Sequence, residues 1–187
     1  MLPVRQIQTV EHGRSTAEGL GVSQFSSGPG LRVTVLYTTT EGTLAALRAA
    51  GSLAQNLGAR IALVETEVVP IHFPADNPPV SIDFLERRHI ALVSESGIQA
   101  EEVHIEIYLC RDRLQCLRRV LNPPSLVVIG GRRLWWSSGE QELERLIRAL
   151  GHHVIFVDSE ARKYAGSFLH SHLRPLLRRV LALYEGL

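Results

Sequence analysis

Cysteines, aromatic residues and long apolar runs are scarce in this chain, and neither sign of charge dominates. Of the 187 residues, 2 are cysteine and 6% are aromatic, while 20 basic side chains nearly match 19 acidic ones. The net charge of +1 produces no global field that would draw the protein to nucleic acid. No run approaches the roughly 18 apolar residues of a membrane span, and residues 1–30 lack the apolar core of a secretion signal. We therefore expect a cytoplasmic protein without a nucleic-acid partner or membrane contact.

The cysteines and histidines do not have the spacing of a reactive or metal-binding site. Cys110 and Cys116 match neither a Cys-x-x-Cys redox pair nor a zinc knuckle, so we expect reduced, partly buried thiols. His170 and His172, if helical, would lie about 200° apart around the helix axis and could not share a metal. Nucleophile-elbow and phosphate-loop motifs are also missing from the sequence. The sequence therefore predicts no metal site, no catalytic residues and no enzymatic activity.

Apolar segments of strand character alternate with segments of helical periodicity from Leu31 onward. The predicted strands are 31–37, 61–69, 103–110, 126–129 and 154–157, and each intervening segment carries an apolar stripe at helical spacing. Connections of this length between successive strands are typical of parallel sheets. The sequence predicts a Rossmann-like three-layer α/β fold, in which helices cover both faces of a five-stranded parallel sheet.

Several residues mark where the predicted helices begin and end. Gly58 and Gly97 follow apolar stripes and predict left-handed residues at helix ends. Ser81 and Asp112 precede such stripes and predict N-caps. One of the three threonines at 38–40 is expected to cap the first helix.

The third and fourth strands have different patterns. In 103–110, apolar residues alternate strictly with His104, Glu106 and Tyr108. Such alternation is typical of a strand with one wet face, and we place it at a sheet edge. The uninterrupted apolar run 126–129 predicts a central strand.

The chain divides into three parts. Residues 1–30 are polar and are interrupted by glycine and proline, which predicts a flexible N-terminal arm. Residues 31–158 are predicted to form the α/β domain. Residues 159–187 predict an amphipathic helical extension, with Pro175 opening its final helix. Three interpretations of this extension stay open: packing on its own domain, exchange across a dimer, or peripheral docking on an acidic membrane or protein surface as an adaptor.

The element order and lengths, together with the stretch Ser-Leu-Val-Val-Ile-Gly-Gly at 125–131, resemble the universal stress protein family over 31–158. The resemblance implies the sheet order 3-2-1-4-5, with the C-terminal helix lying beyond the usual family endpoint. This order reverses between the first and fourth strands, where open α/β sheets bind ligands beyond their carboxyl ends. The candidate binding residues at those two strand ends are Tyr37, Thr38, Thr39, Gly130, Gly131, Arg132 and Arg133.

The ATP motif of the family is degraded in this chain. ATP-binding members have an acidic residue after the first strand, and a Gly-x-x-Gly, nine residues and a Gly-Ser or Gly-Thr pair after the fourth. Here Tyr37 is followed by threonines, and Arg133 stands at the second glycine's place. An arginine fills space that a phosphate cradle leaves open, and Glu140 repels phosphate at the next helix start. The resemblance implies a regulatory or binding protein with an altered or lost ATP site. The alternative is a sensor that still binds an adenine nucleotide at the two strand ends.

The fifth strand is apolar at four consecutive positions, which a solvated sheet edge should not be. These positions are Val154, Ile155, Phe156 and Val157. Family members commonly pair this strand antiparallel across a two-fold axis. The resemblance therefore implies a homodimer through these residues, to which exchange of the C-terminal helix could add.

Overall fold

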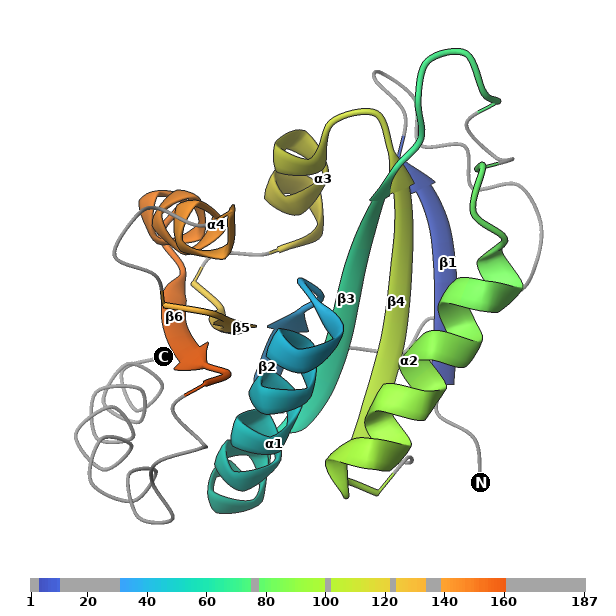
Figure 1. Ribbon diagram of the computed structural model, residues 1–187. Coiled ribbons are helices and arrows are strands. Elements are labelled where there is room, and N and C mark those ends of the chain that lie inside the picture. The colour runs from blue at the N-terminus through green and yellow to red at the C-terminus, as the bar shows by residue number, and fades with distance from the viewer. Residues whose placement is uncertain are drawn as a thin grey trace.

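The computed structural model describes residues 4–10, 31–74, 78–99, 102–121, 124–133 and 139–160. Its strands are β1 (Val4–Val10), β2 (Arg32–Leu36), β3 (Arg60–Val68), β4 (Val103–Cys110), β5 (Leu126–Gly131) and β6 (His153–Asp158). Its helices are α1 (Thr40–Leu57), α2 (Ile82–Ser96), α3 (Arg113–Val120) and α4 (Gly139–Ala149) (Figure 1). Within these described ranges, no helix has the length and apolar character needed to cross a membrane.

The strands form one parallel sheet. Its order is β1-β4-β3-β2-β5-β6, and every neighbouring pair is parallel. From β4 to β6 this is the predicted order 3-2-1-4-5, so the predicted Rossmann-like α/β fold is confirmed. At the sheet centre, Val35 of β2 is in register with Leu63 of β3 and Val128 of β5. Because the order reverses between β2 and β5, their carboxyl ends lie side by side.

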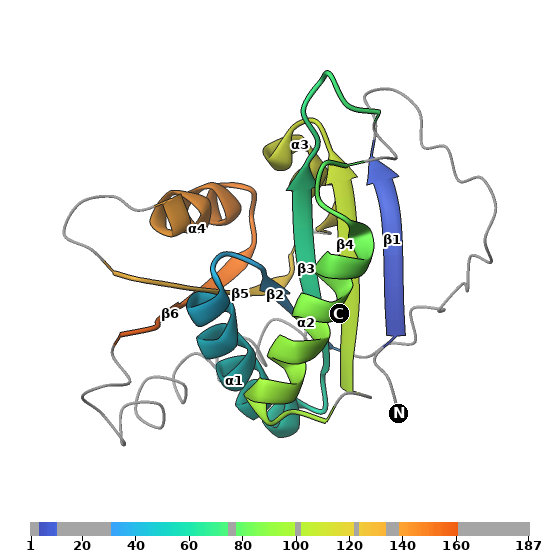
Figure 2. The same ribbon diagram turned by 45° about the vertical axis from the view of Figure 1, so that its right-hand side comes forward.

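The predicted position of β4 at a sheet edge is wrong, because β1 pairs along its outer side (Figure 2). The register runs from Val4 beside His104 to Val10 beside Cys110. The sheet therefore has one strand more than the five predicted. This strand comes from within the expected flexible arm, 1–30, whose remaining residues lie outside the described ranges.

The polar residues of β4 explain why its pattern was misleading. Glu106 and Tyr108 are 7% and 8% exposed. The Tyr108 hydroxyl donates to Glu106 Oε2 at 3.0 Å, and Arg32 Nη2 lies 2.7 Å from the same oxygen. Because these groups satisfy one another, the polar face of the strand does not require water. The alternation of apolar and polar residues in β4 reflects a buried polar cluster. It does not indicate whether another strand pairs with the outer side of β4.

Helices cover both faces of the sheet. Helices α1 and α2 pack on one face, and α3 and α4 pack on the other (Figure 1). The first core includes Val33, Val35, Leu47, Leu53, Leu63, Leu85, Ile105 and Val128, and the second includes Leu36, Val64, Leu117, Val127, Ile129, Leu143 and Ile147. Burying each such side chain stabilises the fold by about 1.5–3 kcal/mol. The two cores fix the positions of the strand ends described below.

Most of the predicted helix boundaries are confirmed. Thr39 caps α1 and Asp112 caps α3, each side chain accepting a hydrogen bond from a backbone N–H of the first turn. Gly58 and Gly97 end their helices with left-handed φ angles of 60° and 79°. Ser81 stands at the N-cap of α2 but makes no capping hydrogen bond through its side chain.

Strand β6 ends the sheet order, as the sequence predicted. Val154 is buried, while Ile155, Phe156 and Val157 are half-buried within a single chain. Of the predicted C-terminal extension, 159–187, only 159 and 160 lie within the described ranges, so its helix and the three interpretations of it stay predictions.

Candidate functional site

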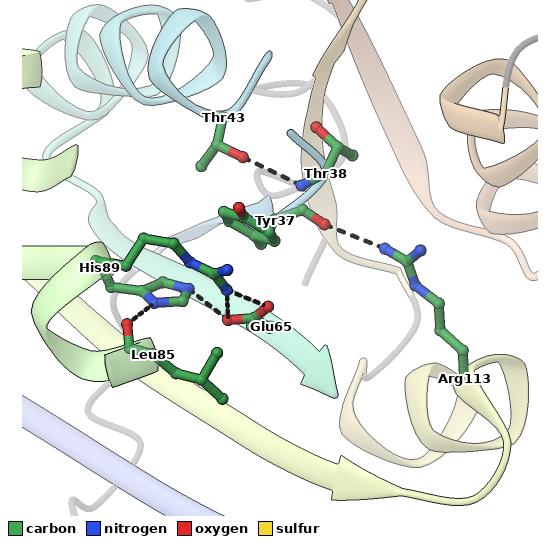
Figure 3. A network of polar contacts seen from close by, with 8 residues as sticks. Tyr37, Thr38, Thr43, Glu65, Leu85, His89 and Arg113 are labelled. Atoms are coloured by element: carbon green, nitrogen blue, oxygen red, sulfur yellow. Dashed lines mark hydrogen bonds and ion pairs between the residues drawn. The ribbon is translucent and has the colours of Figure 1, made fainter. Parts of the chain in front are cut away.

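The two predicted strand ends meet, and we call this place the β2–β5 junction: residues 37–39 after β2 and 130–133 at the end of β5. Thr38 Oγ1 donates a hydrogen bond of 2.6 Å to the carbonyl oxygen of Gly130. The backbone N–H of Thr38 donates to Thr43 Oγ1 of α1 at 3.1 Å (Figure 3). The threonine therefore ties the turn after β2 both to β5 and to the first helix.

Helix α1 begins in direct backbone contact with β5. The Thr39 side chain accepts from the N–H of Gly42, which positions the first turn. A Cβ added to Gly130 would lie 1.8 Å from the Gly42 carbonyl oxygen, and one added to Gly42 would lie 2.5 Å from the Gly130 oxygen. Both positions therefore require glycine for close approach, although neither has a positive φ. The two glycines therefore allow the backbone of α1 to contact the backbone of β5.

The rest of the β5 end is also in contact with other parts of the chain. A Cβ on Gly131 would lie 2.7 Å from Cγ of Glu140, so the Glu140 side chain lies against this glycine. Arg132 Nη2 forms an ion pair of 2.8 Å with Glu160. The Arg133 guanidinium lies 5.0 Å from the ring centroid of Phe156. Both predicted binding arginines are thus engaged within the chain: Arg132 pairs with Glu160 beyond β6, and Arg133 lies over Phe156 in β6.

Tyr37, a further predicted site residue, faces α2 rather than β5 (Figure 3). Its ring lies 5.2 Å from the His89 ring, and the Arg88 guanidinium lies over it at 4.3 Å. Its carbonyl oxygen accepts a hydrogen bond of 3.1 Å from Arg113 of α3. The sequence grouped this tyrosine with the junction, but the structure places its side chain in a second polar cluster.

That cluster is centred on Glu65, near the carboxyl end of β3 (Figure 3). Arg88 Nη2 lies 2.6 and 2.8 Å from the two carboxylate oxygens of Glu65. His89 Nε2 lies 3.0 Å from Glu65 Oε2, and its Nδ1 lies 2.5 Å from the Leu85 carbonyl oxygen. His89 Nε2 therefore lies close to the carboxylate but forms no hydrogen bond with it. We call these residues, with Tyr37, the Glu65 cluster.

The Glu65 and His89 side chains of the Glu65 cluster are buried. Glu65 is 5% exposed and His89 is 0% exposed. Burial by itself raises the pKa of Glu65, but His89 and Arg88 outweigh it and hold the pKa below its ordinary value of 4.5. Burial, reinforced by the charge of Glu65, raises the pKa of the neighbouring Glu67. The carboxylate is therefore ionised and paired inside the fold, where pairing offsets the cost of burying its charge.

Sequence reasoning missed Glu65, although a signal for it was present. An acidic residue interrupts the otherwise apolar start of the strand predicted at 61–69, and His89 lies on the predicted apolar stripe of α2. A carboxylate inside an apolar strand and a histidine on an apolar helix stripe both require polar partners if they are buried, and each could supply one for the other. Among the described residues, no three His, Cys, Asp or Glu side chains are arranged to hold a metal ion.

Comparison with known proteins gave matches only among solved structures. No protein-family model matches the chain. No curated protein matches it either. The structure is similar to that of a universal stress protein from Archaeoglobus fulgidus, with 14% identity and a TM-score of 0.47 over 68% of this chain and 93% of that one.

Two further solved structures are similar to this chain at comparable identity and TM-score. One is a universal stress protein in complex with cAMP, with 14% identity and a TM-score of 0.42 over 70% of this chain and 98% of that one. The other is a member of the same family from Burkholderia pseudomallei, with 21% identity and a TM-score of 0.41 over 67% and 94%. Each of these three TM-scores lies below 0.5, so the similarity assigns no function to this chain.

Proposed function

We propose that this protein is a non-enzymatic regulatory protein with a universal stress protein-like fold, whose β2–β5 junction is closed by its own groups. The observation that carries the proposal is the contact between the turns: Thr38 hydrogen-bonds to Gly130, and Gly130 abuts Gly42. Because backbone groups of the protein fill the junction, we propose that the protein works through contacts with other protein chains. It would not work by converting a small molecule. A sheet of this kind serves many functions, so the proposal rests on these local contacts.

ATP does not fit the junction in the manner of the family. A phosphate cradle requires exposed backbone N–H groups and glycines that leave room for the anion. Here Gly130 is in contact with α1, and the carboxylate-bearing side chain of Glu140 lies against Gly131. The Arg133 guanidinium, which could have held a phosphate, lies over Phe156. These contacts support loss of the family's nucleotide function.

We expect no thermal stabilisation of the protein by millimolar ATP or cAMP. Ligand that binds only the folded state stabilises it by about 2.7 kcal/mol at a concentration 100 times the Kd, so saturable binding would be plain in a melting curve. A melting temperature unchanged by either nucleotide supports the proposal. A saturable rise that is lost in Arg132→Ala and kept in the exposed control Arg145→Ala would instead support the alternative, an adenine-nucleotide sensor.

We also propose that the protein assembles as a homodimer through β6, with the residues at 154–157 in the interface. The support is the apolar character of a strand that ends the sheet, because an uncovered apolar edge pairs readily with another strand. Antiparallel pairing about a two-fold axis would bury the same strand from both copies. Exchange of the predicted C-terminal extension, 159–187, could extend that interface.

Light scattering of the full chain at micromolar concentration measures this directly. We expect a mass twice the 20.8 kDa of one chain. A mass of one chain across the micromolar range would reject the dimer while leaving the closed junction untouched.

A further inference from the structure

Strand β6 ends the sheet, so the backbone groups on one of its sides point away from β5. His153 and Ser159 donate their backbone N–H groups, each at 2.9 Å, to carbonyl oxygens at or beside the two ends of β5. Backbone groups of a strand point to its two sides at alternate residues. The residues whose N–H and C=O groups point away from β5 are therefore Val154, Phe156 and Asp158. A second strand that pairs with β6 must do so through these residues.

One of the outward groups already has a partner, which comes from α4. Arg148 Nη2 donates a hydrogen bond of 2.7 Å to the carbonyl oxygen of Val154. The same guanidinium is held by Glu144, one helical turn earlier, whose Oε1 lies 2.9 Å from Nη2 and 3.1 Å from Nε. Charged side chains at a sheet edge commonly restrict the pairing of an edge strand. Arg148 therefore occupies the amino end of the free edge of β6.

We propose that Arg148 sets the register in which two copies of β6 pair, so that the two-fold axis passes between the two copies of Val157. The inference rests on the proposed dimer through β6 and does not involve the β2–β5 junction. Residues that face each other across a two-fold axis are equally far from it. Phe156 of one copy would then exchange backbone hydrogen bonds with Asp158 of the partner subunit. Val154 would keep its hydrogen bond to Arg148.

Registers closer to the amino end of β6 require the carbonyl group that Arg148 occupies. With the axis at Phe156, the N–H of Asp158 of the partner subunit would need the Val154 carbonyl. With the axis at Ile155, the N–H of Phe156 of the partner subunit would need it. In both registers each copy would lose the charge-assisted hydrogen bond from Arg148, which is stronger than a neutral one.

The register one step closer to the carboxyl end is disfavoured by charge. With the axis at Asp158, the two copies of this aspartate would lie directly opposite each other, and like charges in that position are destabilising. The same register would pair Phe156 with Glu160 of the partner subunit, but the Glu160 N–H already donates to Asp158 Oδ1 at 3.0 Å. The axis at Val157 avoids both conflicts.

The side chains on the two faces of β6 agree with this register. On one face, the Arg133 guanidinium lies 5.0 Å from the centroid of the Phe156 ring. The carboxylate of Asp158 of the partner subunit would come beside that ring, and its charge is opposite to that of Arg133. On the other face, two copies of Val157 would meet, and pairs of β-branched side chains stabilise neighbouring strands.

Cysteine cross-linking in the full chain locates the axis. We expect Val157→Cys to form an interchain disulfide on mild oxidation, because facing positions at the axis bring two Cβ atoms close enough. Ile155→Cys, on the same face, should form little, because its two copies would lie about 13 Å apart along the strands. The original chain, oxidised in parallel, is the control for Cys110 and Cys116, which are 4% and 1% exposed.

Light scattering of the same samples separates the two ways in which the inference can fail. A mass of one chain would reject the dimer itself. A mass of two chains without a disulfide at Val157→Cys, or with the disulfide at Ile155→Cys instead, would overturn the register and leave the dimer intact.

Removal of the guanidinium tests the role of Arg148. In Arg148→Ala the Val154 carbonyl can accept from the partner strand, so the axis should move to Phe156, where each copy gains a backbone hydrogen bond. We expect the Val157→Cys cross-link to fall several-fold in this background and the dimer dissociation constant to fall about tenfold. Arg145→Ala, exposed on the same helix, should change neither quantity. An Arg148→Ala chain that is folded by circular dichroism and keeps both values would show that Arg148 does not set the register.

Discussion

Replacing Glu65 with glutamine is expected to lower the free energy of unfolding by about 3 kcal/mol, because it leaves the partly buried guanidinium of Arg88 without its counter-ion and removes the carboxylate beside His89. The carboxylate is almost fully buried and contacts both side chains within 3.0 Å. For a chain of this size the loss corresponds to a fall of roughly 10 °C in melting temperature. Urea unfolding followed by circular dichroism measures it. The matched control is Glu95→Gln at an exposed position of α2, which should change little.

Acid titration shows whether the loss comes from the charge of Glu65. Its pKa is lowered in the fold, so its stabilising contribution is present above its ordinary value of 4.5 and is lost as pH falls through the folded value. The stability gap between the original chain and Glu65→Gln should therefore close as the solution is acidified below that range. A gap that is small at neutral pH, or constant with pH, would show that Glu65 is not a buried, paired carboxylate.

Gly130→Ala is expected to cost at least about 3 kcal/mol or to prevent folding, because the new methyl group would collide with backbone. The nearest atom, the Gly42 carbonyl oxygen, would lie 1.8 Å from the added Cβ. Neither that carbonyl nor β5 can yield easily, since α1 is anchored by its cap and β5 is paired on both sides. Gly42→Ala, with a contact of 2.5 Å to Gly130, should give a loss of the same kind. Denaturant unfolding compares the variants.

Gly139→Ala is the matched control for this experiment. Gly139 is the first residue of α4, and an added Cβ would meet nothing within 4 Å. Alanine favours helix over glycine by roughly 1 kcal/mol in a helix interior, so the control should be neutral or slightly stabilising. A Gly130→Ala variant as stable as this control would mean that α1 and β5 are not in backbone contact.

Local features of the fold could be predicted because they depend on near neighbours in the chain. The left-handed Gly58 and the cap Asp112 are signals of this kind, and both were confirmed. The apolar run 126–129 likewise predicted an interior strand, and β5 pairs on both sides, with β2 and β6. Strand β1 could not be predicted in the same way. Its residues are largely polar, and its partner β4 follows it by about a hundred positions in the sequence.

The candidate site could be predicted only in part, for a similar reason. The sequence placed Thr38 and Gly130 together through the strand order, and the structure joins them by a hydrogen bond. It could not show that Arg132 pairs with Glu160 or that Arg133 lies over Phe156, because such contacts depend on how distant segments pack. The orientation of a side chain at a strand end is set by tertiary neighbours and not by local pattern.

Together, these contacts fill the carboxyl ends of β2, β3 and β5 with groups of the protein itself. At the β2–β5 junction, backbone meets backbone through two glycines. One strand further on, the Glu65 cluster places an ionised carboxylate between an arginine and a histidine. Both arrangements stabilise the place where related sheet topologies bind ligands. Under the proposed function, these strand ends contribute to the stability of the fold and do not bind a nucleotide.

A titration of the isotopically labelled protein with ATP, followed through backbone amide resonances, tests the closed junction most directly. The informative signals are those of Gly42, Gly130 and Gly131, which have distinct amide nitrogen shifts and lie at the point of contact. The closed junction predicts that these resonances keep their positions up to millimolar ATP. Saturable shifts confined to these glycines and to Thr38 would show that nucleotide enters the junction, which is then not closed.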